Sequence, residues 1–266
     1  MNYISSNKNP AIKVLKSLKD KRHREAKNMY FIEGIRFVQE ALKENVKIDK
    51  IFVSEKLEYT NGGKEMLKTI DKTKKDCFTL PHKLFKEISD TDSPQGILAQ
   101  IEMQKYSLDT MLYKDNFFVV LDSIQDPGNM GTIIRTADAA GATGLILSRG
   151  CVDIYNPKVL RSTMGSIFHI PIYSSNDILK DLNYLKDKKI KLCASHLEGK
   201  KPYYSLDNVS NIAVIIGNEA KGISDDIKNI SNSLVKIPMV GRAESLNASV
   251  AAGLLMFEIM RKRMQI

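Results

Sequence analysis

The sequence has 266 residues, 43% of them hydrophobic, which is enough for one or two folded domains with a buried core. Lysine and arginine outnumber aspartate and glutamate by 40 to 31, a net charge of +9 that suits a polyanionic partner and equally suits solvated helix faces. No stretch reaches the roughly 18 apolar residues of a membrane helix, and no signal-peptide core is present, so we expect a cytoplasmic protein without a membrane partner. The cysteines and histidines are scattered without ligand spacing, which predicts no metal site.

Short helices and strands alternate through the first hundred residues. The pattern predicts helices at 10–19, 35–46, 64–70 and 81–88, and strands at 30–32, 48–53, 77–80 and 97–101. We therefore expect a small α/β domain over residues 1–103, followed by a polar linker at 104–116. Much of the positive charge lies at the start of this domain, at Lys8, Lys13, Lys16, Lys19, Lys21, Arg22, Arg24 and Lys27.

Stronger strands separated by helical segments occupy residues 117–266. Continuous apolar runs predict strands at 117–121, 144–147, 168–172, 190–194, 212–216 and 234–237, with helices at 130–140, 157–164, 177–186 and 246–263. Runs of this kind are buried on both faces, so we expect an α/β fold with a parallel sheet covered by helices. Ligands of such sheets bind beyond the carboxyl ends of the strands.

Three polar segments that follow predicted strands carry residue types suited to a ligand site. The first turns at a Pro-Gly pair and enters a helix, with Asn129 at the helix start and Arg135 further along. An amide and a guanidinium beside free backbone N–H groups suit a phosphate or a ribose. An ordinary turn with a surface arginine explains this segment slightly better when it is taken alone.

The other two segments change that balance. Glycines flank a single acid, Glu219, in the second segment, and Gly217 lets the backbone approach a ligand closely. The third segment places a hydroxyl and an amide, Ser245 and Asn247, at the start of a helix rich in small residues. A plain helix cap needs only one such residue, so the pair indicates a further role.

In this order, the three segments resemble the signature motifs of the SpoU (TrmH) RNA 2′-O-methyltransferases of the SPOUT superfamily: N-x-G-x-x-x-R-T, G-x-E-x-x-G and I-P-M followed by S-L-N-x-S. Each motif alone is weak, but the ordered set is highly specific. The Phe-Ile-Glu-Gly run at 31–34 and the helix after it resemble the ribosomal-protein-like substrate-binding domain of many members. The resemblance is close in the second half of the chain and loose in the first.

The resemblance implies a deep trefoil knot in the C-terminal domain, dimerisation through that domain, and S-adenosylmethionine bound in the knot. The matching cofactor-binding positions are Gly217, Ile237 and Leu246, together with Ser195 and Leu197 in the loop after the strand at 190–194. The matching catalytic positions are Arg135, Asn129, Glu219, Ser245 and Asn247. The RNA-binding candidates are Arg161 and the basic residues Arg22 and Arg24. For Arg161, a position on a helix surface without a role in RNA binding is nearly as good an interpretation.

The implied reaction transfers a methyl group to a ribose 2′-oxygen, which loses its proton as it attacks. Alignment of the reactants makes the largest contribution to the rate acceleration, and removal of the proton makes the second largest. The family places Arg135 nearest that oxygen, yet a guanidinium keeps its proton up to a pKa above about 12. Arg135 is therefore a base only if its pKa is strongly depressed; otherwise it stabilises an oxyanion or orients a phosphate. Asn129, Ser245 and Asn247 would orient Arg135 or the ribose, and Glu219 would position RNA or brace the site.

Ribosomal RNA is the expected partner, because a separate domain that resembles ribosomal proteins suits a folded RNA feature. A transfer-RNA 2′-O-methyltransferase is the first alternative. A non-catalytic RNA-binding protein of ribosome assembly is the second, and the intact motif residues argue against it. A conventional doubly wound methyltransferase would have a glycine-rich first turn and an acid after the next strand, and the sequence has neither.

Overall fold

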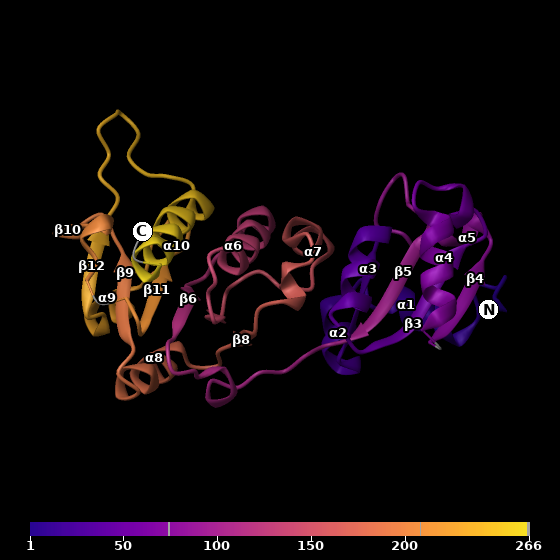
Figure 1. Ribbon diagram of the computed structural model, residues 1–266, viewed down its shortest axis with the longest axis horizontal. Coiled ribbons are helices and arrows are strands. Elements are labelled where there is room, and N and C mark those ends of the chain that lie inside the picture. The colour runs from indigo at the N-terminus through magenta and orange to yellow at the C-terminus, as the bar shows by residue number, and fades with distance from the viewer. Residues whose placement is uncertain (74, 208, 265–266) are drawn as a thin grey trace. The chain divides into compact units, whose positions relative to one another are not determined.

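The computed structural model describes residues 1–73, 75–207 and 209–264, and the chain divides into two compact units (Figure 1). Unit 1 comprises Met1–Gln104 together with Tyr155–Leu160, and unit 2 comprises Lys105–Ile154 and Arg161–Ile266. Each unit has its own β-sheet. None of the described helices is long and apolar enough to cross a membrane.

Unit 1 is built on a five-stranded mixed sheet with the order β1-β4-β3-β5-β2. The strands are β1 Asn2–Tyr3, β2 Met29–Glu33, β3 Ile48–Ser54, β4 Asp76–Leu80 and β5 Ile97–Glu102. The helices are α1 Pro10–Ser17, α2 Lys21–Lys27, α3 Ile35–Lys43, α4 Gly63–Lys72 and α5 His82–Ile88. Side chains of α1 and α5 share an apolar cluster with the sheet, among them Leu15, Phe52 and Phe85. The helices and strands expected in this half are confirmed, with ends that differ by a few residues.

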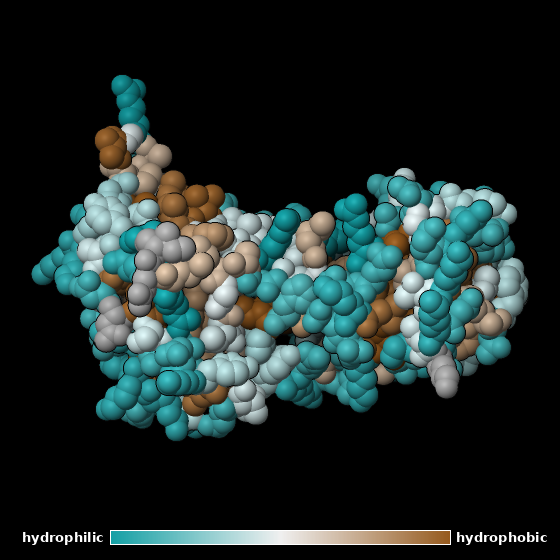
Figure 2. Space-filling model, viewed as in Figure 1, coloured by the Kyte–Doolittle hydropathy of each residue, from teal (hydrophilic) through white to brown (hydrophobic). Residues whose placement is uncertain are grey.

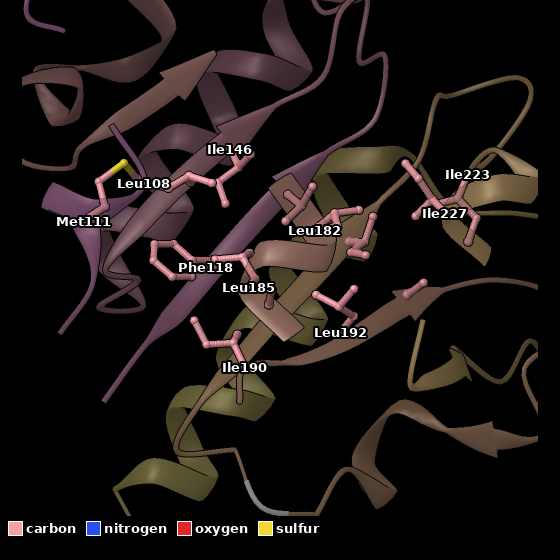
Figure 3. Close-up of a cluster of buried hydrophobic side chains, with 14 residues drawn as sticks. Leu108, Met111, Phe118, Ile146, Leu182, Leu185, Ile190, Leu192, Ile223 and Ile227 are labelled. Carbon is pink, nitrogen blue, oxygen red and sulfur yellow. The ribbon is translucent and has the colours of Figure 1, made fainter. Parts of the chain in front are cut away.

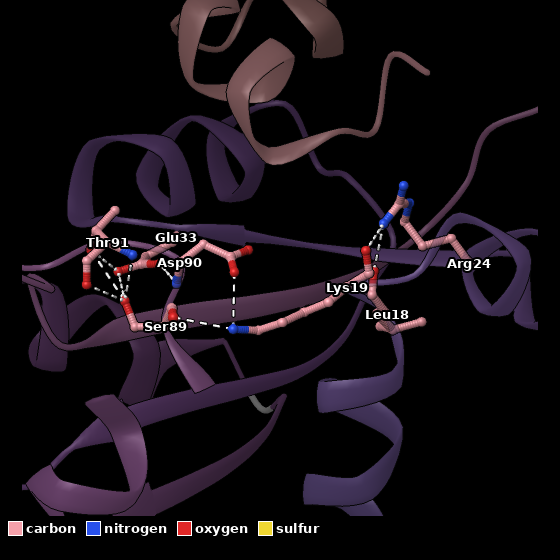
Figure 4. Close-up of polar contacts among 7 residues, drawn as sticks. All are labelled: Leu18, Lys19, Arg24, Glu33, Ser89, Asp90 and Thr91. Atoms are coloured by element: carbon pink, nitrogen blue, oxygen red, sulfur yellow. Dashed lines mark hydrogen bonds and ion pairs between the residues drawn. The ribbon is translucent and has the colours of Figure 1, made fainter. Parts of the chain in front are cut away.

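Arg24 holds the turn between α1 and α2 (Figure 4). Its side chain is 4% exposed, and Nη1 donates hydrogen bonds of 2.8 Å to the carbonyls of Leu18 and Lys19. The expected role of Arg24 in RNA binding is therefore corrected, because a buried guanidinium bonded to the backbone does not reach a phosphate. Arg22, on the same helix, is exposed.

Glu33 orders the loop after α5 (Figure 4). Its carboxylate, at the end of β2, accepts hydrogen bonds of 2.6 Å from the hydroxyls of Ser89 and Thr91 and one of 3.0 Å from the backbone N–H of Asp90. The acid of the Phe-Ile-Glu-Gly run thus has a structural role inside unit 1.

Unit 2 is built on a seven-stranded sheet in which all paired strands run parallel, with the order β10-β12-β9-β11-β6-β7-β8. The strands are β6 Phe117–Leu121, β7 Gly144–Leu147, β8 Ile172–Ser174, β9 Lys191–Ser195, β10 Lys201–Pro202, β11 Ile212–Ile216 and β12 Ser233–Lys236. The helices are α6 Pro127–Ala139, α7 Pro157–Thr163, whose residues up to Leu160 belong to unit 1, α8 Ile178–Asp187, α9 Asp225–Ile230 and α10 Ala248–Arg263. The expected parallel α/β sheet is confirmed.

Helices cover both faces of this sheet. On one face, Phe118 of β6 packs in an apolar cluster with Leu182 and Leu185 of α8 and with residues around α9 (Figure 3). On the other face, α6 and α10 pack against each other and against the sheet. Leu108 and Met111 belong to the first cluster, although they lie in the stretch expected to be a linker. That stretch therefore contributes to the core of unit 2.

The strand expected at 168–172 is wrong. Ser166–Phe168 forms a turn of 3-10 helix, and β8 begins only at Ile172. The residue before β8 is Pro171, which has no N–H for a strand ladder, although its carbonyl accepts a hydrogen bond of 2.9 Å from Leu145. The sequence pattern also did not predict α9 or the two-residue strand β10.

Candidate active site at the carboxyl edge of the parallel sheet

The three motif segments meet at one edge of the sheet in unit 2. They follow β6, β11 and β12, and parallel strands place all of their carboxyl ends at the same edge. The first segment becomes the N-terminus of α6, where Asp126 caps the helix by accepting a hydrogen bond of 2.7 Å from the backbone N–H of Asn129. The third becomes the N-terminus of α10, which Asn247 caps.

Side-chain hydrogen bonds join the three segments through Asn129. Its Nδ2 donates to Glu219 Oε1 over 3.0 Å, and its Oδ1 accepts from Asn247 Nδ2 over 2.9 Å. Asn129 is 8% exposed, so both ends of its amide are held away from solvent competition. We call Glu219, Asn129 and Asn247 the motif network. Residues 118 positions apart in sequence are thereby fixed against each other.

Glu219 holds the first turn in addition to Asn129. Its carboxylate accepts hydrogen bonds from the backbone N–H groups of Gln125 (3.3 Å) and Asp126 (3.2 Å). Partial burial alone would raise the pKa of Glu219, but hydrogen bonds from the Asn129 amide and from backbone N–H groups outweigh it, and the pKa lies below its usual value. Of the two roles expected for Glu219, the geometry supports bracing of the site.

A cavity of about 370 Å³ opens beside the motif network. It is lined by every residue expected to bind a cofactor, namely Ser195, Leu197, Gly217, Ile237 and Leu246. Glu219 and Ser245 line it as well. Eleven further lining residues were not expected, among them His196, Lys221, Lys236, Met239 and Glu244. Met239 completes the I-P-M motif, so the motif itself carried the signal for that one.

The lining of this cavity fits the groups of S-adenosylmethionine. Apolar side chains such as Ile237 and Leu246 suit an adenine ring, and the charged side chains suit the zwitterionic methionine part. At Gly217 the backbone of a neighbouring loop comes so close that a Cβ would lie 2.2 Å from the carbonyl carbon of Gly222. The cavity wall is therefore main chain at this point, as a backbone-reading cofactor site requires.

Arg135 lies outside the motif network. It is exposed on α6, and its side chain makes no hydrogen bond or ion pair with the residues that the structure describes. It is six positions after Asn129, which places the two about 120° apart around the helix. The network therefore does not hold Arg135 by direct bonds. Arg161, on α7, is also exposed.

Comparison with protein families gives two matches along the chain. Residues 116–257 match the SpoU rRNA Methylase family, and residues 9–99 match the MRM3-like substrate binding domain. The chain belongs to the SpoU rRNA methylase family. The resemblance drawn from the three motifs is thereby confirmed, and so is that of the first domain.

Curated relatives and solved structures match nearly the full length of this SpoU chain. The 23S rRNA (guanosine(2553)-2'-O)-methyltransferase RlmP of Bacillus subtilis is 34% identical over 97% of this chain and 99% of its own length. An AdoMet-bound rRNA methyltransferase from Sinorhizobium meliloti superposes with a TM-score of 0.86 at 30% identity, covering 98% of both chains. The SpoU methyltransferase AviRb from Streptomyces viridochromogenes, in complex with AdoMet, gives 0.85 at 26% identity, covering 97% of this chain and 100% of that one.

Proposed function

We propose that this SpoU protein is an RNA 2′-O-methyltransferase that transfers the methyl group of S-adenosylmethionine to a ribose in ribosomal RNA. The motif network beside a cavity that suits the cofactor is the observation that carries the proposal. Ribosomal RNA is favoured because the RlmP relative matches both units, whereas a solved structure that concerns the 2-OH methylation of C/U34 on tRNA covers only 57% of this chain.

In the proposed mechanism the protein mainly aligns the reactants. Bound S-adenosylmethionine supplies an electrophilic methyl group. The main chain around Gly217 and the apolar side chains of Ile237 and Leu246 hold the cofactor in the cavity. The motif network fixes the start of α6 and the start of α10 against this cavity, and Ser245 is free to hydrogen-bond the ribose. Because the side chains of the network hydrogen-bond to one another, we expect the network to form a rigid surface against which the ribose binds.

Arg135 provides positive charge in this mechanism. The guanidinium stabilises the developing 2′-oxyanion or holds the adjacent phosphate, and the proton of the hydroxyl leaves to solvent. Arg161 and Arg22 are proposed to bind phosphates of the same RNA. Both are exposed, as that role requires.

The architecture implied by family membership is part of the proposal. We assign residues 1–103 to RNA binding and residues 117–266 to catalysis, and the matched ranges 9–99 and 116–257 lie within these bounds except for residue 116. Family membership supports a deep trefoil knot in the catalytic domain. A ribosomal RNA substrate supports a location in the cytoplasm.

Exposed apolar residues on α10 support a homodimer of this protein. Val250, Leu254 and Phe257 are 51%, 36% and 45% exposed and recur at helical spacing on one side of α10. Val240, in the loop before α10, is fully exposed at 101%. Figure 2 shows hydrophobic surface over α10 and on this loop. A second copy of the chain would remove this surface from water.

Phe257→Asp is expected to convert the dimer to a monomer at micromolar concentration, because it places a charge inside the apolar interface. Light scattering after gel filtration measures the mass. Tyr59→Asp, which adds the same charge at an 80% exposed aromatic residue of unit 1, is the control and should stay dimeric. A monomeric wild-type protein, or a dimeric Phe257→Asp variant, contradicts the proposal.

Mapping of 2′-O-methyl groups in total RNA tests the function itself. Deletion of the gene is expected to remove a modification from ribosomal RNA, and the wild-type gene should restore it. Loss of a site from transfer RNA instead would change the substrate. An identical map with and without the gene would contradict the enzymatic proposal.

A further inference from the structure

A buried cluster joins the end of β6 to the end of β7, next to the motif network. Asp122 and Ser148 are 8% and 7% exposed, and Ser148 Oγ donates to Asp122 Oδ1 over 3.0 Å. The other Asp122 oxygen accepts from the backbone N–H of Ser224 over 3.0 Å, which adds the loop before α9. Ser148 Oγ also accepts from the backbone N–H of Ser123 over 2.9 Å. Neither Asp122 nor Ser148 takes part in the proposed chemistry.

This cluster holds Ser123 in an unusual conformation. Its φ is 58°, a left-handed value that costs a non-glycine residue energy and persists only when the surroundings enforce it. Its carbonyl accepts from Asn218 Nδ2 over 2.7 Å, and its hydroxyl donates to the carbonyl of Arg149 over 3.3 Å. Gly150, with φ +94°, lies so close that a Cβ would be 3.1 Å from Ser123 Oγ. The backbone on both sides of Arg149 is thereby fixed.

Arg149 is the cationic side chain that this arrangement presents at the surface. It is exposed, and no described residue pairs with its guanidinium. Its own carbonyl lies within hydrogen-bond distance of the hydroxyls of Ser123 (3.3 Å) and Ser148 (3.1 Å), so the cluster holds the main chain of Arg149 and leaves its side chain unpaired among the described residues. An unpaired guanidinium on a fixed backbone is suited to bind an anion, because the protein loses less conformational entropy when the anion binds.

The order of the strands places Arg149 on the side of the site that the cofactor does not use. The cavity is formed by segments that follow β9, β11 and β12, on one side of β6, whereas Arg149 follows β7 on the other side. The motif network lies between them, at the ends of β6 and β11. For a ribose placed over the network with its reactive oxygen toward the cavity, the end of β7 lies on the side away from the cofactor.

We propose that Arg149 binds a phosphate of the substrate RNA beside the target ribose, and that Ser148 and Asp122 position it through Ser123. The proposal rests on the proposed function, since it takes RNA as the ligand. Arg149 acts in RNA binding only and makes no contact with the reacting atoms. Ser148 is a positioning residue.

The test measures binding of an unmethylated 23S ribosomal RNA transcript at several salt concentrations. Arg149→Ala is expected to weaken binding about two- to fivefold. It should also reduce the slope of log Kd against log salt by about 0.7 to 0.9, the share of one phosphate contact. Arg149→Lys should keep the slope. Lys191→Ala removes the same charge from the amino end of β9, at the opposite edge of the sheet, and should leave the slope at its wild-type value.

A double-mutant cycle tests the positioning by Ser148. Ser148→Ala is expected to weaken RNA binding in the wild-type protein and to have no further effect when Arg149 is already alanine. An equal effect of Ser148→Ala in both backgrounds overturns the positioning role. An unchanged salt slope in Arg149→Ala, or the same change in Lys191→Ala, overturns the phosphate contact. If the wild-type protein methylates the transcript, a negative result in either test counts against the role of Arg149 or Ser148 and not against the proposed function.

Discussion

Arg135→Ala should bind S-adenosylmethionine as well as the wild-type protein does and should transfer methyl groups about 10²- to 10³-fold more slowly. The expected magnitude is that of one group that stabilises charge developing in a transition state. Arg135 contacts none of the described residues through hydrogen bonds or ion pairs, so its loss costs the fold little. It also lies outside the lining of the cavity, so cofactor affinity should not change.

The same measurement distinguishes the two roles of the guanidinium. Single-turnover rates at saturating RNA and cofactor report the methyl-transfer step, and calorimetry reports cofactor affinity. If Arg135 stabilises charge, Arg135→Lys should recover part of the rate and keep the pH profile of the wild-type protein. If Arg135 is the base, the profile of the lysine variant should shift with the lower pKa of lysine. Lys191→Ala serves as the charge-matched control, and full turnover by Arg135→Ala would remove Arg135 from the mechanism.

The sequence predicted the parts of this site that depend on local pattern. Glycines around a single acid located Gly217 and Glu219, and apolar runs located the strands whose ends carry them. The contact of Asn129 with Asn247 was beyond local pattern, because it depends on how α6 and α10 pack after the sheet has formed. The family motifs placed both residues in the site, but no spacing rule predicted their hydrogen bond.

The errors have the same physical origin. Arg24 lies in a basic stretch of sequence that is typical of a solvent-exposed helix. Only the folded turn brings the two carbonyls that its guanidinium binds into reach. The apolar run at 168–172 has strand composition, but Pro171 within it cannot donate to a ladder. Leu108 and Met111 stand in a polar stretch, and their burial depends on a face of the sheet built by residues much later in the chain. Tertiary packing decides each of these cases.

Gly217→Ala is expected to abolish measurable S-adenosylmethionine binding, a loss of at least about 100-fold. A Cβ at this position would lie 2.2 Å from both the carbonyl carbon of Gly222 and the nitrogen of Ile223. Both are backbone atoms, so the clash cannot be relieved by rotation of a side chain. The loop from 217 to 223 must move, and overpacking of this kind also destabilises a protein by about 1–3 kcal/mol.

The expected loss of binding comes from what that loop holds. Asn218 and Gly222 exchange two backbone hydrogen bonds of 2.9 Å, and the Asn218 side chain binds the carbonyl of Ser123 over 2.7 Å. A displaced Gly222 therefore moves the cavity wall, Glu219 and the end of β6 together. The cofactor would lose the backbone contacts proposed for it, and the network would lose the carboxylate of Glu219 at the same time.

Gly241→Ala is the matched control, since a Cβ there meets nothing within 4 Å and the residue lies in the loop that leads to α10. Calorimetry with the cofactor and thermal unfolding of both variants separate binding from stability. Gly241→Ala should behave as wild type in both measurements. Because the Gly217 clash is local to the cavity wall, a melting temperature lowered by only several degrees is expected alongside complete loss of binding. Wild-type affinity in a folded Gly217→Ala protein would mean that the cofactor binds elsewhere.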